Sequence, residues 1–365
     1  MKTLKLDTFK LHQSIGIIFI SKIKPSDLLA MSVVDRRRIE DDDEVLGIQR
    51  ELRRDKVIQI QNYLSSIDAT FPNSIIVNTT SDFIVDETDF HLELKIDANT
   101  FTIIDGQHRV EGFREIDLDD FELLVAIFKD LKTDQQANIF STINSEQTKV
   151  DPSLNLNLEL NSKVYTPKKM MIEVAQSLNY DKESPWYQNI RMLGSNSKGM
   201  ISLKAFVSPL LDITYPERDY YLIRNELMKN DKEFPDFNNF TYKTERYLFW
   251  ELYKRKDTNS AYKILFNYFN SLQNILNKDW LNQQSLLNKT TGYNAIMKLF
   301  KDIVKVGFEK GDLSQSYFFE NLKPLSEMNG TITSDNYGAS GTKASNELYY
   351  EMKKLWLTSA IANAG

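Results

Sequence analysis

Strand-like and helix-like patterns alternate over the first 160 residues of the chain, and only helix-like patterns follow. The run Phe121–Phe128 is apolar and β-branched, which is typical of a buried strand. Apolar residues three to four positions apart in Thr133–Gln147 are typical of an amphipathic helix. The alternation predicts an α/β lobe over residues 1–160, with a small mixed sheet and flanking helices. A mostly helical lobe is expected over residues 161–365.

The expected elements follow from the same periodicities. Strands are expected at Ser14–Ser21, Ser74–Thr79, Phe90–Ile96, Phe101–Ile104 and Phe121–Phe128. Helices are expected at Lys24–Ala30, Gln49–Ile67, Val110–Ile116, Thr133–Gln147, Lys163–Leu178, Tyr220–Lys229, Tyr242–Lys254, Ser260–Leu276, Tyr293–Val306 and Asn346–Ser359. The segment Asn329–Ser345 is rich in Gly, Ser, Thr and Asn, and a flexible loop is expected there. Within it, Gly338 to Lys343 resembles a phosphate-binding loop only loosely, since no apolar strand precedes it.

The amino-acid composition excludes several classes of functional site. The chain has no cysteine and only three histidines, which excludes disulfide frameworks, thiol nucleophiles and cysteine zinc sites. No apolar run is long enough to cross a bilayer and no signal peptide is present, so a cytoplasmic protein without a membrane partner is expected. Residues 1–160 have a net charge of −11 and residues 161–365 a net charge of +5. If the chain binds DNA, the second lobe is therefore the expected contact.

The segment with the clearest chemistry follows the expected strand Phe101–Ile104. Gly106 lies where the chain must turn sharply before a helix, and backbone N–H groups at a helix start attract anions. His108 and Arg109 add side-chain donors, and the planar guanidinium fork suits phosphate oxygens. Asp105 lies at the strand end, where it could coordinate Mg²⁺ or orient a water. The alternative is a purely structural turn with a salt-bridged arginine and a hydrogen-bonded histidine.

This segment resembles a known signature. The sequence IDGQHRVEGF over Ile104–Phe113 is similar to that of the DGQHR-domain proteins of the ParB/sulfiredoxin-like superfamily. Three further segments resemble the family in order and spacing: the G-x-Q-R segment Gly47–Arg50, the strand start Phe71–Ile75, and the F-x-x-I-N-x-x-Q helix Phe140–Gln147. The resemblance covers about residues 45–155. The relatives include DndB, associated with DNA phosphorothioation, and DpdB, associated with deazaguanine DNA modification.

The resemblance implies a ParB/sulfiredoxin-like fold for the first lobe and a nucleotide site at its turn. Gly106, His108 and Arg109 would contact phosphate, while Asp105 and Gln107 would assist with metal, water or hydrogen bonding. The absence of cysteine excludes sulfinic-acid reduction. No helix-turn-helix signature is visible, so a role in chromosome segregation is not implied.

Four further residues are candidate nucleotide contacts. The resemblance places Gln49 and Arg50 near the nucleotide from an adjacent helix, although a helix-start glutamine and a solvated arginine would look the same. Asn144 and Gln147 lie three positions apart and share a helix face. They could present amides to a base or ribose, or they could bond to backbone.

Two functions from different classes remain. The first is a nucleotide-binding protein, a slow ATPase that uses ATP or another nucleoside triphosphate with Mg²⁺, acting in DNA modification or phage defence. Its catalytic residues would be Asp105, which holds the metal or a water, and His108, which holds phosphate charge together with Arg109. The alternative is a non-catalytic, DndB-like DNA-binding regulator, with proteins of DNA modification or defence as partners. No second carboxylate motif supports a nuclease.

Overall fold

A computed structural model describes most of the chain and divides it into two compact units, Met1–Lys149 and Val150–Gly365. The described residues are 2–34, 38–39, 45–46, 52–116, 118, 120–146, 150–193, 198–229, 233–338 and 341–362. Among these residues, no helix is both long and apolar enough to cross a membrane.

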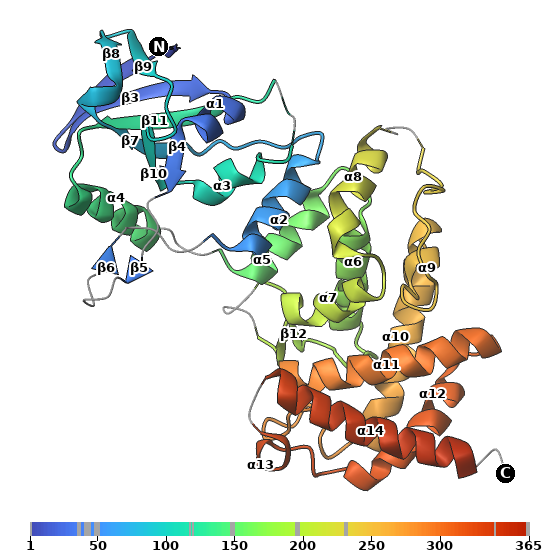
Figure 1. The fold of residues 1–365 in the computed structure, drawn as a ribbon. Coiled ribbons are helices and arrows are strands. Elements are labelled where there is room, and N and C mark those ends of the chain that lie inside the picture. Colours follow the sequence, from blue (N-terminus) through green and yellow to red (C-terminus); the bar gives the residue numbers. More distant parts are fainter. Residues whose placement is uncertain are drawn as a thin grey trace. The chain divides into compact units, whose positions relative to one another are not determined.

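The first unit contains a six-stranded mixed sheet with the order β2-β3-β11-β7-β10-β4 and a three-stranded antiparallel sheet with the order β1-β9-β8 (Figure 1). In the larger sheet, β11 runs parallel to β7, and β10 runs antiparallel to β7. The strands are β1 (Thr3–Asp7), β2 (Phe9–Gln13), β3 (Gly16–Ile23), β4 (Ser32–Val34), β5 (Arg38–Ile39), β6 (Val45–Leu46), β7 (Ile75–Thr79), β8 (Ile84–Glu87), β9 (His91–Lys95), β10 (Phe101–Asp105) and β11 (Leu123–Lys129). The helices are α1 (Pro25–Ala30), α2 (Arg54–Leu64), η1 (Ser81–Phe83), α3 (Gln107–Gly112) and α4 (Thr133–Glu146).

Both faces of the larger sheet are covered, which explains why β11 is apolar up to its last residue, Lys129. Successive strand residues point to opposite faces. Val125 and Ile127 belong to a core that includes residues of α1, α2 and α3. Ala126 and Phe128 belong to a second core, against which α4 packs. The sheet is thus sandwiched between α1–α3 and α4.

Helices α2 and α3 pack closely because α3 ends in a glycine. A Cβ added to Gly112 would lie 2.4 Å from Cγ2 of Ile60 on α2, a distance that no real pair of atoms tolerates. This close packing brings the start of α3 next to the start of α2. It therefore positions the turn that precedes α3.

The second unit is helical and is built around an aromatic core. Trp186 is fully buried, and its ring lies 5.2–5.6 Å from the rings of Phe206, Phe269, Trp280 and Tyr293. Aromatic edge-to-face contacts at such distances add to the hydrophobic stabilisation. The elements are α5 (Pro152–Asn157), η2 (Leu158–Asn161), α6 (Pro167–Tyr180), β12 (Ile190–Arg191), β13 (Ile201–Ser202), α7 (Leu203–Asp212), η3 (Glu217–Asp219), α8 (Tyr220–Lys229), α9 (Trp250–Lys254), α10 (Thr258–Ile275), α11 (Thr290–Lys310), α12 (Gln315–Leu322), η4 (Lys323–Met328), α13 (Ser334–Tyr337) and α14 (Thr342–Ala362).

The predicted fold class is confirmed: an α/β lobe with a small mixed sheet and flanking helices precedes a mostly helical lobe. The units meet at residues 149 and 150, about ten residues before the expected boundary, because α5 and η2 pack on α6 and α7. The expected helix over Tyr242–Lys254 is wrong in its first half, since α9 begins at Trp250. The helices α7 and α12 were not expected. The expected loop over Asn329–Ser345 is also wrong in part, because α13 lies within it and α14 begins at Thr342.

Candidate functional site

The turn between β10 and α3 depends on a glycine. Gly106 has a φ of +99°, a left-handed conformation that side chains other than glycine rarely adopt. A Cβ on this residue would also lie 2.5 Å from Cδ1 of the fully buried Ile75. The chain can therefore leave the strand at Asp105 and enter α3 at Gln107. The expected start of this helix at Val110 was three residues too late, because the turn requires a single residue.

Arg109, a residue of α3, stabilises the turn through three hydrogen bonds. Its Nη2 donates to Oδ2 of Asp105 at 2.9 Å and to the carbonyl oxygen of Ser74 at 3.1 Å, and its Nη1 donates to the carbonyl of Asn73 at 2.6 Å. The ion pair is largely buried, with side-chain exposures of 18 % for Arg109 and 28 % for Asp105. Burial lowers the pKa of Arg109, while Asp105 raises it. The motif arginine thus links the end of β10 to the start of β7.

His108 connects the same turn to α2. Its Nε2 accepts a hydrogen bond from the backbone N–H of Arg53, the residue before α2, at 3.0 Å. Because Nε2 accepts, the proton of the neutral ring is assigned to Nδ1. Burial and the nearby charges of Lys56 and Arg53 lower the pKa of His108, against the opposing effect of Asp55 and Asp105. His108 therefore offers a neutral N–H donor at Nδ1.

The lowered pKa of His108 makes stability depend on pH in a predictable direction. The unfolded chain protonates its histidine near a pKa of about 6.5, and the folded protein binds that proton less readily. The contribution of His108 to stability is therefore fully present above the pKa of the unfolded chain. It is lost as the pH falls from there through the lower pKa of the folded protein. In His108→Gln, the amide oxygen can replace Nε2 as acceptor but cannot titrate. We expect the parent to lose more thermal stability than His108→Gln between pH 7.5 and 5.5, and parallel melting profiles would contradict this.

Five further residues were predicted for the site, and the structure describes two of them, Gln107 and Asn144. Gln107 is buried, at 7 % exposure, in the first turn of α3. The Asn144 amide donates to the carbonyl of Phe140 in its own helix at 2.8 Å, so its NH₂ group bonds to backbone, as the structural alternative expected. Gln49, Arg50 and Gln147 lie outside the described residues.

The turn supplies one carboxylate, one imidazole and one guanidinium within a few residues. Within the described part of the chain, no group of three or more histidine or acidic side chains could hold a metal ion by itself. A metal at Asp105 would therefore need ligands from elsewhere, such as the phosphates of a nucleotide.

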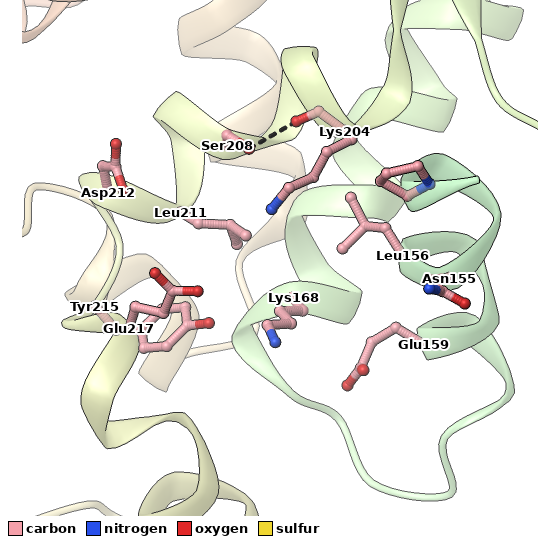
Figure 2. Close-up of a pocket in the computed structure, with 11 residues that line it drawn as sticks. Asn155, Leu156, Glu159, Lys168, Lys204, Ser208, Leu211, Asp212, Tyr215 and Glu217 are labelled. Carbon is pink, nitrogen blue, oxygen red and sulfur yellow. Dashed lines mark hydrogen bonds between the residues drawn. The ribbon is translucent and has the colours of Figure 1, made fainter. Parts of the chain in front are cut away.

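The second unit contains a different candidate, which the sequence did not reveal. A cavity of about 430 Å³ lies between α5, α6 and α7 and is called the α5–α7 cavity below. Lys168 and Lys204 extend toward its centre, and the carboxylate of Glu217 and the hydroxyl of Tyr215 face them from one side (Figure 2). The charged residues that line it are Glu159, Lys168, Lys204, Asp212 and Glu217. Among the described residues, none of these five forms an ion pair.

Burial affects two of these charges. It lowers the pKa of Lys168, whose Nζ lies 3.5 Å from the ring centroid of Tyr220, and Lys204 lowers it further. Burial and the nearby Glu217 raise the pKa of Asp212. Charges of both signs around one cavity suit a polar or charged small molecule. No local motif could have shown this, because the residues come from separate helices.

Comparisons with known proteins find one matching family, and the match extends from the first unit into the second. A family described as DndB, DNA-sulfur modification-associated, matches residues 8–210, more than half of the chain. No curated protein matches. One similar solved structure is that of the C-terminally truncated chromosome-partitioning protein ParB from Caulobacter crescentus complexed with CTP-gamma-S. Its sequence identity is 11 %, its TM-score is 0.28, and the match covers 58 % of this chain and 86 % of that chain. A likeness this low supports no conclusion about the present chain.

Proposed function

Because the chain belongs to the DndB family of DNA-sulfur modification-associated proteins, we propose that it binds a nucleoside triphosphate and acts in DNA-sulfur modification. The nucleotide, with ATP expected first, binds at the turn from Asp105 to Arg109. Slow Mg²⁺-dependent hydrolysis and a role in phage defence belong to the same proposal.

The observation that carries the proposal is the set of hydrogen-bond donors at one strand end. Arg109 uses three of its five N–H donors on Asp105 and on the carbonyls of Asn73 and Ser74. The remaining donors, and the Nδ1–H of His108, are suited to phosphate oxygens. Neutral and cationic donors together can hold a polyphosphate that carries several negative charges.

Asp105 fits Mg²⁺ only as part of a nucleotide complex. Mg²⁺ in proteins is commonly held by one or two carboxylates together with substrate phosphates. One carboxylate at the turn agrees with that arrangement and not with a resident ion. The bound ion would neutralise phosphate charge. Asp105 would either keep its hydrogen bond to Arg109 or give up that bond to coordinate the metal.

Asp105→Asn tests whether this carboxylate serves hydrolysis. The amide oxygen can still accept from Arg109, so we expect the fold and metal-free nucleotide binding to persist. Phosphate release in the presence of Mg²⁺ should fall about 100-fold, because the carboxylate that holds the metal or orients the water is lost. The measurement is phosphate release at saturating nucleotide, with and without Mg²⁺.

Glu111→Gln is the matched control, since Glu111 belongs to the same helix but pairs with Arg114 and not with a residue of the turn. This variant should release phosphate at the parental rate. Unchanged release by a well-folded Asp105→Asn protein would exclude Asp105 from the reaction.

A non-catalytic regulator is the second candidate, and the ion pair between Asp105 and Arg109 favours it. A carboxylate that is already held by a guanidinium is less available to a metal ion or a water. In that case the nucleotide would act as a switch, and the second unit would contact DNA. Nucleotide binding without any phosphate release would support this candidate.

A further inference from the structure

A second cavity of the helical unit lies at the beginning of two long helices. It has a volume of about 580 Å³ and is bounded by the end of α7, the first half of α11 and the first turn of α14; we call it the α11–α14 cavity. It shares Ser208 and Asp212 with the α5–α7 cavity. Its location is independent of the turn at Asp105, which belongs to the other unit.

Both helices present their positive ends to this cavity. Helices α11 and α14 are each 21 residues long, and Thr290, Thr291 and Thr342 from their first turns line the cavity. No side chain caps α11, and neither helix has an acidic residue in its first turn. The first backbone N–H groups of a helix have no partner within the helix, and the macrodipole adds about half a positive charge there.

An independent observation concerns Ser345, one turn into α14. Ser345 is 2 % exposed and lines the same cavity, and its hydroxyl has no hydrogen-bond partner among the described residues. A buried hydroxyl without a partner is unfavourable. A ligand that accepts a hydrogen bond from this hydroxyl would satisfy it.

Two lysines of α11 supply charge. Lys298 and Lys301 line the cavity, and Lys298 also donates to Oδ1 of Asn346 at 2.6 Å. Asp212 is the one acidic residue among the lining residues that the structure describes. The fixed charges therefore sum to +1, and the helix ends add to the positive potential.

We propose that the α11–α14 cavity binds a phosphate group. The donor set consists of two helix starts, the Ser345 hydroxyl and the lysine ammonium groups, and tetrahedral oxyanions are bound by such sets. The volume exceeds that of one phosphate, and Pro209 and Met297 give part of the wall an apolar character. The phosphate therefore belongs to a larger molecule, either a small phosphate ester or the DNA backbone.

The sequence contains a partial signal for this site. Gly338 to Lys343 resembles a phosphate-binding loop loosely, and Gly341 and Thr342 from that segment do line the cavity. The missing part is a preceding strand. The other donors of the cavity come from α11, which lies far from this segment in the sequence, so a local motif cannot predict them.

Inorganic phosphate is the probe for the test, with the full chain and with chloride controls of equal ionic strength. Without phosphate, Ser345→Ala should melt no lower than the parent, because it removes an unsatisfied buried hydroxyl. Phosphate should raise the melting temperature of the parent, and the dissociation constant should increase about tenfold in Ser345→Ala and in Lys301→Gln. Lys310→Gln, at the other end of α11, should behave as the parent.

His108→Gln separates this site from the proposed nucleotide site. Phosphate stabilisation that persists in His108→Gln and is lost in Lys301→Gln supports the α11–α14 cavity, even if no nucleotide binds at the turn. No stabilisation of the parent, or equal stabilisation in all variants, overturns the proposal. The same titrations with a small phosphate ester and with a duplex oligonucleotide identify the source of the phosphate. The source is the ligand whose dissociation constant increases in Ser345→Ala.

Discussion

Replacing Arg109 with alanine is expected to lower the free energy of unfolding of the first unit by about 3 kcal/mol and to weaken nucleotide binding at least about tenfold. The stability loss follows from the contacts of the guanidinium. Its removal leaves the Asp105 carboxylate and the carbonyls of Asn73 and Ser74 without their common donor. Calorimetric unfolding measures the first effect, and titration with nucleotide well below the melting temperature measures the second.

Arg114→Ala is the matched control, because Arg114 is 59 % exposed and pairs with Glu111 on the surface. Such exposed pairs contribute about 0–1 kcal/mol. The double variant Asp105→Asn, Arg109→Ala should be more stable than the sum of the single changes predicts, since it leaves no unpaired carboxylate at the turn. Additive effects would show that Asp105 and Arg109 do not stabilise each other.

Gly106→Ala is expected to destabilise the first unit by about 2–4 kcal/mol. Two causes act together. The left-handed φ of +99° is strained for alanine, and its Cβ would overlap with Cδ1 of Ile75. Because Ile75 is fully buried between strands, it cannot move away freely. Chemical denaturation of the folded protein measures the difference.

Two further variants separate these causes. Gly16 also has a positive φ, +139°, but a Cβ there meets nothing within 4 Å, so Gly16→Ala should show only the conformational effect. Shortening Ile75 to valine removes Cδ1 and should relieve part of the overlap in Gly106→Ala. If Ile75→Val gives no relief, the contact with Ile75 does not explain the requirement for glycine.

Much of the fold could be predicted because periodicity survives tertiary packing. The buried strand β11 and the amphipathic α4 stand out in the sequence, and both occur within two residues of the expected bounds. The edge strands β1 and β2 were missed although apolar and polar residues alternate in both, because each has only five residues and two apolar side chains; only one of their ten residues is buried. The helix α7 was missed because Pro209 lies inside it, and proline ordinarily ends a helix.

The candidate site was predictable as a motif but not as a set of contacts. A strand, an Asp-Gly turn and a helix start can be read from adjacent residues. The partners of Arg109 and His108 come from β7 and from the start of α2, and only the folded sheet brings those segments together. The sequence predicted a donor at His108, but not the bond to the Arg53 N–H that leaves only Nδ1 to donate. The α5–α7 and α11–α14 cavities join residues of helices that are distant in sequence, and only Gly341 and Thr342 belong to a segment with a local signal.

The most direct test of nucleotide binding at the turn is thermal stabilisation by ATP, GTP and CTP, with and without Mg²⁺, of the parent and of His108→Gln. A ligand that binds only the folded protein raises its stability by about 2.7 kcal/mol at 100 times the dissociation constant. Glutamine can keep the bond to the Arg53 N–H through its amide oxygen, but its NH₂ group is attached one atom farther along the side chain and does not occupy the position of Nδ1. We therefore expect at least one nucleotide to stabilise the parent and to bind His108→Gln about tenfold more weakly. Absence of stabilisation by every nucleotide, or equal stabilisation of both proteins, would contradict a nucleotide site at this turn.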